Sequence, residues 1–236
     1  MYLDPLYMLI MILAMLLGGA AQLWVSSSFS RWSLVRASSG LTGERAARRM
    51  LDQAGLSHVR IERVAGRLSD HYDPRAKVLR LSPDVHDKPS VAAVSVACHE
   101  AGHAIQDATA YSPLVIRNAI VPVASFGSNL SLILIIIGLL LMSAAPLLGQ
   151  SIAIIGVLLF ATVVAFQIIN LPVEFDASSR AKESIAAMQL VHSREEAEGV
   201  NRVLTAAAMT YVAATVIAVL QLLYWLHRLG LLGGRR

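Results

Sequence analysis

Residues 130–169 read LSLILIIIGLLLMSAAPLLGQSIAIIGVLLFATVVAFQII, and this stretch decides the class of fold. A helix needs about 20 predominantly apolar residues to cross a bilayer. Two runs of that length occur here, at 130–148 and 151–169, with a short turn at 145–150 between them. The stretch therefore predicts a hairpin of two transmembrane helices.

Two more runs extend this hairpin to about four spans. Residues 5–25 are apolar, and residues 203–226 lack charge but carry threonines and Gln221, so we expect this last span to face protein in part. The chain is 56% hydrophobic and 15% charged, whereas soluble domains are roughly 25% charged. The prediction is a mainly α, multi-pass membrane protein.

The basic residues indicate the orientation. Asp4 stands where a signal peptide would carry basic residues, so the first run reads as a retained anchor. Thirteen Lys and Arg lie within 26–124 and four within 171–205, which predicts that both regions are cytoplasmic. This orientation places Arg228, Arg235 and Arg236 on the opposite side, where the rule disfavours basic residues, but they are outnumbered. The predicted parts are an anchor at 1–28, a cytoplasmic zincin-like region at 29–125, a transmembrane hairpin at 126–170, a cytoplasmic helix at 171–202, and a last span with its tail at 203–236.

The region 29–125 predicts a small α+β fold. Thr42 suits the N-cap of an amphipathic helix that Gly55 ends, and we expect this helix to lie on the membrane surface. Its arginines lack interleaved aromatic residues, so no nucleic-acid site is expected. Residues 59–64 and 77–82 read as strands, with the turn signal Asp73-Pro74-Arg75 between them. They predict a β-hairpin that packs on the following helix.

That helix carries VACHEAGHAIQD at residues 96–107 and begins near Pro89 or Ser90. His99 and His103 are four residues apart, so their Cβ atoms lie about 6 Å apart on one face. Glu100 is rotated by about 100° and can approach a metal without binding it. This is H-E-x-x-H, the pattern of zinc metalloproteases. The small Ala101 and Gly102 permit close approach of another segment, and the alternative is a pair of core histidines bonded to backbone. The single cysteine, Cys98, forms no intrachain disulfide and reads as a buried helix residue.

A hydrolytic zinc site takes three protein ligands and one water, so a third ligand must come from elsewhere. Asp107 would stretch the ligands along about 12 Å of helix and is expected to be a supporting or surface residue. Glu174 is the better candidate, because it follows the third span on the same side of the membrane as His99. Pro172 suits the start of a helix that reaches Met188. No spacing singles out the other histidines, His58, His71, His86 and His192.

The chain resembles the YugP-type bacterial membrane zinc metallopeptidases along almost its whole length. The resemblance rests on HEAGHAIQ, on the upstream LSDHYDPRAKVLRLSP and SGLTGERAARRMLDQAGL, and on the downstream LPVEFDASSRA and Leu204-Thr205-Ala206-Ala207-Ala208. It implies a neutral zinc metallopeptidase of the bacterial inner membrane with one Zn²⁺ per chain. It also implies a gluzincin-like core, distantly similar to the HtpX-type and CAAX-processing proteases.

In those relatives the glutamate of E-x-x-x-D is the third ligand and its aspartate braces a ligand histidine. The resemblance thus implies Glu174 as a ligand, but the aspartate position falls on Ser178. Asp176, two residues from Glu174, points elsewhere on a helix. The identity of the brace therefore stays open.

The predicted reaction is peptide-bond hydrolysis of a peptide or protein substrate at the cytoplasmic membrane surface. Glu100 is the expected general base, which takes a proton from the zinc-bound water and gives it to the leaving amine. The edge of the hairpin is a candidate for pairing with an extended substrate. Candidate donors to the oxyanion are Arg180, Tyr111, His71 and Tyr72.

Two rival interpretations remain. A site-2-type intramembrane protease would need the segment around His99 to be a span, but Asp87, Lys88 and Asp107 flank that segment and Glu100 interrupts it. An inactive metal-binding scaffold or adaptor is the other. Glu100 argues against the scaffold, because zinc binding alone does not require it.

Overall fold

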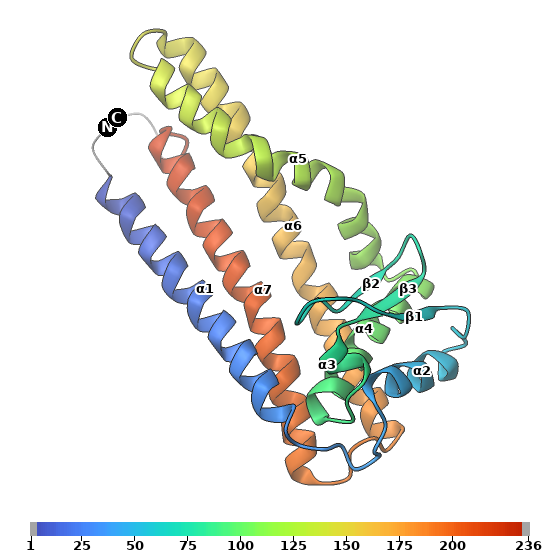
Figure 1. Ribbon diagram of the computed structural model, residues 1–236. Coiled ribbons are helices and arrows are strands. Elements are labelled where there is room, and N and C mark those ends of the chain that lie inside the picture. The colour runs from blue at the N-terminus through green and yellow to red at the C-terminus, as the bar shows by residue number, and fades with distance from the viewer. Residues whose placement is uncertain (1–3, 233–236) are drawn as a thin grey trace. The chain divides into compact units, whose positions relative to one another are not determined.

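A computed structural model describes residues 4–232 (Figure 1). Residues 1–3 and 233–236, with Arg235 and Arg236 of the predicted tail, lie outside the described residues. Four of the described helices are long and apolar enough to cross a membrane, which confirms the prediction of about four spans in a mainly helical protein. They are α1 (Pro5–Trp32), α5 (Ser112–Leu141), α6 (Pro146–Ala187) and α7 (Arg194–Arg228).

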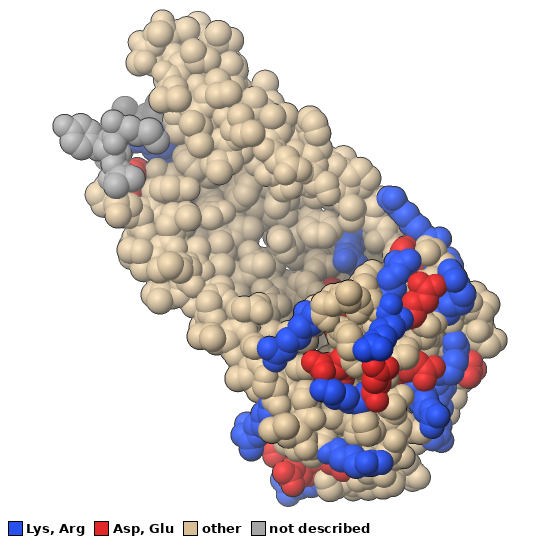
Figure 2. All heavy atoms as spheres, viewed as in Figure 1, with Lys and Arg blue, Asp and Glu red and all other residues tan. Residues whose placement is uncertain are grey.

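The chain divides into two compact units. The first unit comprises Met1–Ala20, Ile116–Leu171 and Tyr211–Arg236, and the second comprises Ala21–Val115 and Pro172–Thr210. Among the described residues of the first unit, only Asp4, Arg117 and Arg228 are Lys, Arg, Asp or Glu. The charged side chains gather elsewhere, over the elements of the second unit, as Figure 2 shows.

The first unit contains a close helical hairpin of α5 and α6. A Cβ added at Gly138 would lie 2.5 Å from the Ala153 nitrogen, so only a residue without a side chain lets the two backbones approach this far. The turn occupies residues 142–145, and the prediction of 145–150 was wrong. Pro146 begins α6, because the first position of a helix needs no backbone N–H.

Two further boundaries differ from the sequence prediction. The helix of the second span begins at Ser112, well before residue 130, because a helix continues through polar residues that an apolar-run criterion leaves out. Pro172 does not begin a helix but lies inside α6. A proline within a helix removes one backbone hydrogen bond, but the helix continues on both sides of it, from Pro146 to Ala187. Similarly, α7 is one helix from Arg194 onward, and Ser193 and Glu196 form a capping box at its start.

The second unit is built on α2 (Gly43–Gln53), α3 (Pro83–His86) and α4 (Val91–Ala108). As predicted, the Thr42 hydroxyl caps α2 and Gly55 follows with a φ of 73°. The apolar face of α2 is buried within the protein core and packs against α4. The apolar stripe that suggested a position on the membrane surface is thus explained by packing on α4, and the surface position of the helix stays a prediction.

The sheet has three strands in the order β1-β3-β2, namely β1 (Arg60–Arg63), β2 (His71–Asp73) and β3 (Val78–Leu81). The two predicted strands pair in parallel, so the hairpin predicted between them was wrong. The hairpin is instead formed by β2 and β3, and its turn is the expected one: the Asp73 carboxylate accepts hydrogen bonds from the nitrogens of Arg75 and Ala76. Three residues are too few for β2 to show an alternating pattern. Both hairpin strands contact α4, as predicted for the hairpin.

Candidate metal centre

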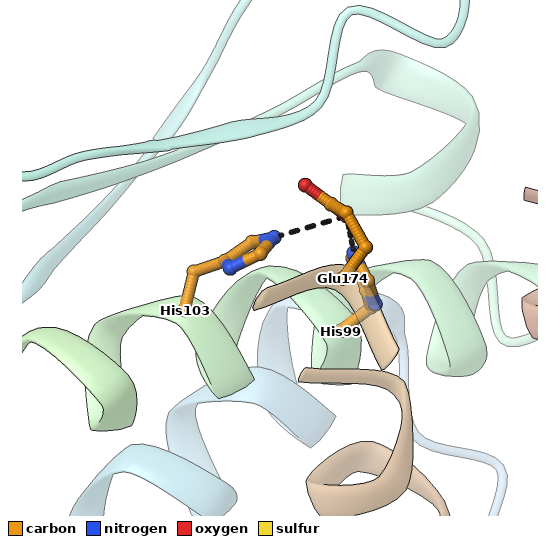
Figure 3. Close-up of side chains that lie close together, drawn as sticks. All are labelled: His99, His103 and Glu174. Carbon is orange, nitrogen blue, oxygen red and sulfur yellow. Dashed lines mark hydrogen bonds and ion pairs between the residues drawn. The ribbon is translucent and has the colours of Figure 1, made fainter. Parts of the chain in front are cut away.

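The histidines of H-E-x-x-H lie on successive turns of α4. Ser90 caps this helix by accepting a hydrogen bond from the Ala93 nitrogen at 3.1 Å, which agrees with the predicted start. Both rings are 9% exposed, and their centroids are 4.8 Å apart. Figure 3 shows the two side chains rising from α4 toward Glu174. The helix therefore presents two imidazoles to one point, as the spacing predicts.

Glu174 comes from α6 and is 2% exposed. Its Oε2 lies 3.2 Å from His99 Nε2 and 3.5 Å from His103 Nε2, and one ligand atom from each residue lies within 4.8 Å of the others. Zinc bonds of about 2.0–2.1 Å at tetrahedral angles separate ligand atoms by about 3.3–3.4 Å. The three donor atoms are of the types that zinc binds, and the two distances from Glu174 to the histidines match the spacing in a tetrahedral zinc site.

A glycine permits α4 to approach α6 at this point. A Cβ added at Gly102 would lie 2.8 Å from the carbonyl oxygen of Ala177 and 3.3 Å from its Cα. Gly102 stands between the two histidines in sequence, and Ala177 is three residues beyond Glu174. The close approach expected from the small residues of the motif is therefore present.

Each histidine uses its second ring nitrogen for a contact within the protein. His99 Nδ1 lies 3.2 Å from Ser178 Oγ, and His103 Nδ1 lies 2.9 Å from Gln106 Oε1. Ser178 thus occupies the position of the expected aspartate and, like that aspartate, contacts a histidine of the candidate metal centre. Asp176 points elsewhere, as its spacing predicts, and accepts hydrogen bonds from Gln106 and Arg180. The sequence analysis missed Gln106, although its i+3 spacing from His103 was a signal.

Glu100 has a half-buried side chain without a hydrogen-bond or ion-pair partner among residues 4–232. Its charge acts on two neighbours. Burial raises the pKa of Asp70, and the Glu100 charge raises it further against the hydrogen bonds from Ser82. Burial opposes protonation of His103, but its hydrogen bond to the Glu174 carboxylate and the charges of Glu100 and Glu174 raise its pKa above the ordinary value.

The candidate oxyanion donors are engaged to different degrees. Tyr72 donates its hydroxyl proton to Asp107 at 2.7 Å, and burial together with this bond raises the pKa of Tyr72 far above its usual range. The Arg180 guanidinium carbon lies 5.9 Å from the centroid of the Tyr111 ring. His71 is exposed, with Nδ1 2.8 Å from the Ser69 oxygen.

The other predicted residues lie outside the cluster. Asp107 binds Tyr72 and Lys77, which agrees with its predicted supporting role. Within the described residues, the group with metal-binding geometry contains none of the other histidines, His58, His71, His86 and His192. Cys98 is fully buried, and burial raises the pKa of its thiol to about 12.

Comparison with known proteins identifies the family. A family model described as "Putative neutral zinc metallopeptidase" matches residues 7–230. The chain is 47% identical over 218 residues to "Putative membrane protease YugP" of Bacillus subtilis (strain 168), covering 92% of this chain and 94% of that protein. No solved structure matches. Since the family model spans nearly the whole chain, the protein belongs to this family of zinc metallopeptidases.

Proposed function

We propose that the protein is a zinc-dependent protease that hydrolyses peptide bonds at the membrane surface, with one Zn²⁺ held by His99, His103 and Glu174. The observation that carries the proposal is the convergence of these three buried donor groups from α4 and α6. A zinc ion with three protein ligands supplies a Lewis acid and a water molecule of lowered pKa.

Glu100 is the proposed general base. Its carboxylate is on the same helix as two of the ligands, is half-buried, and forms no ion pair with another described residue. It takes a proton from the attacking water and gives it to the leaving amine. An unpaired glutamate at this position supports an enzyme over a metal-binding scaffold, which needs no such base.

The oxyanion donor is proposed from the groups that retain a free N–H. Tyr72 donates its proton to Asp107, and this makes it the least suited of the four candidates. Arg180 uses its Nε for Asp176, which leaves the N–H groups of its terminal nitrogens to donate. His71 Nδ1 faces the Ser69 carbonyl oxygen, so the one N–H of a neutral ring is already used. Arg180 is therefore the candidate we retain, with Tyr111 as a residue that packs beneath it.

Strand β2 is the proposed binding edge for the substrate. The strand order β1-β3-β2 leaves one side of β2 without a partner strand, and β2 contacts the helix of the metal centre. An extended peptide that adds to such an edge gains backbone hydrogen bonds. This arrangement favours a substrate with an extended or unfolded segment.

The location follows from α4 and from the basic residues. Helix α4 is not among the candidate spans found in the described residues, and it lies in the core of the second unit. This supports a site outside the bilayer rather than a site-2-type intramembrane centre. The excess of Lys and Arg in the segments of the second unit supports the cytoplasmic side of the bacterial inner membrane.

The test is the zinc content of detergent-purified protein, measured beside casein hydrolysis, for the wild type, Glu174→Ala and Glu100→Gln. We expect about one zinc per chain in the wild type and in an inactive Glu100→Gln, and loss of zinc in Glu174→Ala. Full zinc in Glu174→Ala would remove this residue as a ligand. Zinc without hydrolysis of casein or of a set of unfolded membrane proteins would favour the scaffold.

A further inference from the structure

We infer that Gln106 is a positioning residue of the metal centre, which fixes the tautomer and the ring orientation of His103. The inference rests on the proposed zinc site, and H-E-x-x-H itself gives no role to residue 106. Gln106 is 0% exposed, and its side chain forms three hydrogen bonds. Both N–H groups and the oxygen of this buried amide have partners, which indicates a specific role in the site.

The orientation of the amide is decided by its partners on α6. Gln106 Nε2 lies 2.8 Å from the Val173 carbonyl oxygen and 2.8 Å from Asp176 Oδ2. A carbonyl and a carboxylate only accept hydrogen bonds, so the NH₂ group must face α6. The oxygen Oε1 must then face His103.

The orientation of the amide in turn decides the tautomer of the histidine. Gln106 Oε1 lies 2.9 Å from His103 Nδ1 and can only accept, so Nδ1 carries the hydrogen. In a neutral imidazole the lone pair then belongs to Nε2. Nε2 is the atom that lies 3.5 Å from Glu174 Oε2, on the side where the three donors converge. Gln106 thus holds His103 in the one neutral tautomer that binds a metal through Nε2.

A charged pair anchors this arrangement from behind. Arg180 Nε donates to Asp176 Oδ2 at 2.6 Å, and its guanidinium lies over the Tyr111 ring. The Tyr111 backbone nitrogen in turn donates to the backbone carbonyl of Gln106 at 2.9 Å. Metal-binding histidines in proteins commonly donate to a carboxylate, and loss of such a partner weakens metal binding about 10- to 100-fold. Here an amide stands between the histidine and the carboxylate and passes the polarisation on.

The test compares zinc affinity, by chelator competition, and the visible spectrum of the Co²⁺-loaded protein in wild type and Gln106→Leu. We expect Gln106→Leu to bind zinc about 10- to 100-fold more weakly and to change the Co²⁺ spectrum. Ser95→Ala is the matched control, because Ser95 is also fully buried on α4 and its hydroxyl donates to the Val91 oxygen. It should leave both readouts unchanged.

A double variant keeps the test decisive if Gln106→Leu does not fold. In Gln106→Glu with Asp176→Asn, one oxygen of the new carboxyl group still accepts from His103. Its other oxygen, which replaces Nε2, is protonated and donates to the Val173 carbonyl oxygen, and it accepts from the new amide, so the direction of one bond is reversed. We expect zinc binding much closer to wild type than in Gln106→Leu. Wild-type affinity in Gln106→Leu, or a double variant that binds no better than Gln106→Leu, would overturn the inference. A wild type that binds no zinc would instead refute the proposed function.

Discussion

Replacing Gly102 by alanine perturbs the metal centre without changing a ligand. The added methyl carbon would lie 2.8 Å from the Ala177 oxygen, whereas ordinary contacts begin near 3.4 Å, so α4 and α6 must separate locally by 0.6 Å. His99 and His103 lie on one side of this contact and Glu174 on the other. Metal sites require their ligands to be held within about 0.5 Å, so we expect weaker zinc binding.

The size of the effect follows from the strain. An extra methyl group in a well-packed interior costs about 1–3 kcal/mol. If the zinc-bound state carries this strain and the zinc-free state relaxes, zinc affinity falls about 5- to 150-fold. The gain in helix propensity from glycine to alanine, about 0.5–1 kcal/mol, stabilises both states alike. The zinc-free protein should therefore keep nearly its original melting temperature.

Chelator competition and thermal unfolding, with and without zinc, measure the two quantities. Gly19→Ala is the matched control: it is the same substitution within a helix, at an exposed position with no atom within 4 Å of the added carbon. It should leave zinc affinity unchanged. Wild-type zinc affinity in Gly102→Ala, or an equal loss in both variants, would refute the reasoning from the α4–α6 contact.

Three further outcomes are expected. Asp70→Asn should stabilise the protein at pH 7. Because the pKa of Asp70 is raised, this carboxyl group stabilises the folded state below its unfolded pKa of 3.8, and the stabilisation is lost as pH rises through its folded pKa. The higher melting temperature of the variant should therefore vanish in thermal unfolding near the unfolded pKa. Ser193→Ala removes the hydrogen bond to the Glu196 nitrogen and should lower the free energy of unfolding by about 1 kcal/mol. The activity of the folded variant should stay unchanged, and a loss of that activity would contradict a purely structural cap. Removal of zinc by a chelator should abolish hydrolysis and lower the melting temperature, both restored by added zinc, and an unchanged melting temperature would argue that the ion does not bind the folded site tightly.

Features set by local chemistry were predictable. An apolar run of about 20 residues is long enough to cross a membrane as a helix. The spacing of His99 and His103 places both rings on one helix face, whatever surrounds them. The caps at Thr42 and at Ser193 each act within three residues. Glu174 was selected because the predicted hairpin of spans would return the chain to the side of His99, and because the family resemblance implies it as a ligand.

Features set by packing between distant segments were not predictable. Parallel and antiparallel pairing of residues 59–64 with 77–82 require the same strand pattern, and only the three-residue strand β2, inserted on the far side of β3, distinguishes them. The apolar stripe of α2 fits a membrane as well as it fits α4, and the tertiary structure decided for α4.

The sequence by itself determined about four apolar runs long enough to span a membrane and two histidines on one helix face, because hydropathy and helical periodicity act over short distances. Only the tertiary structure decided how the ligands are supported. Ser178 and Gln106 occupy the second nitrogens of the two rings, and Asp176 reaches Gln106 across 70 residues of chain. These contacts depend on the close packing of α4 and α6 at Gly102. The geometry of this packing depends on both segments together and cannot be read from either one alone.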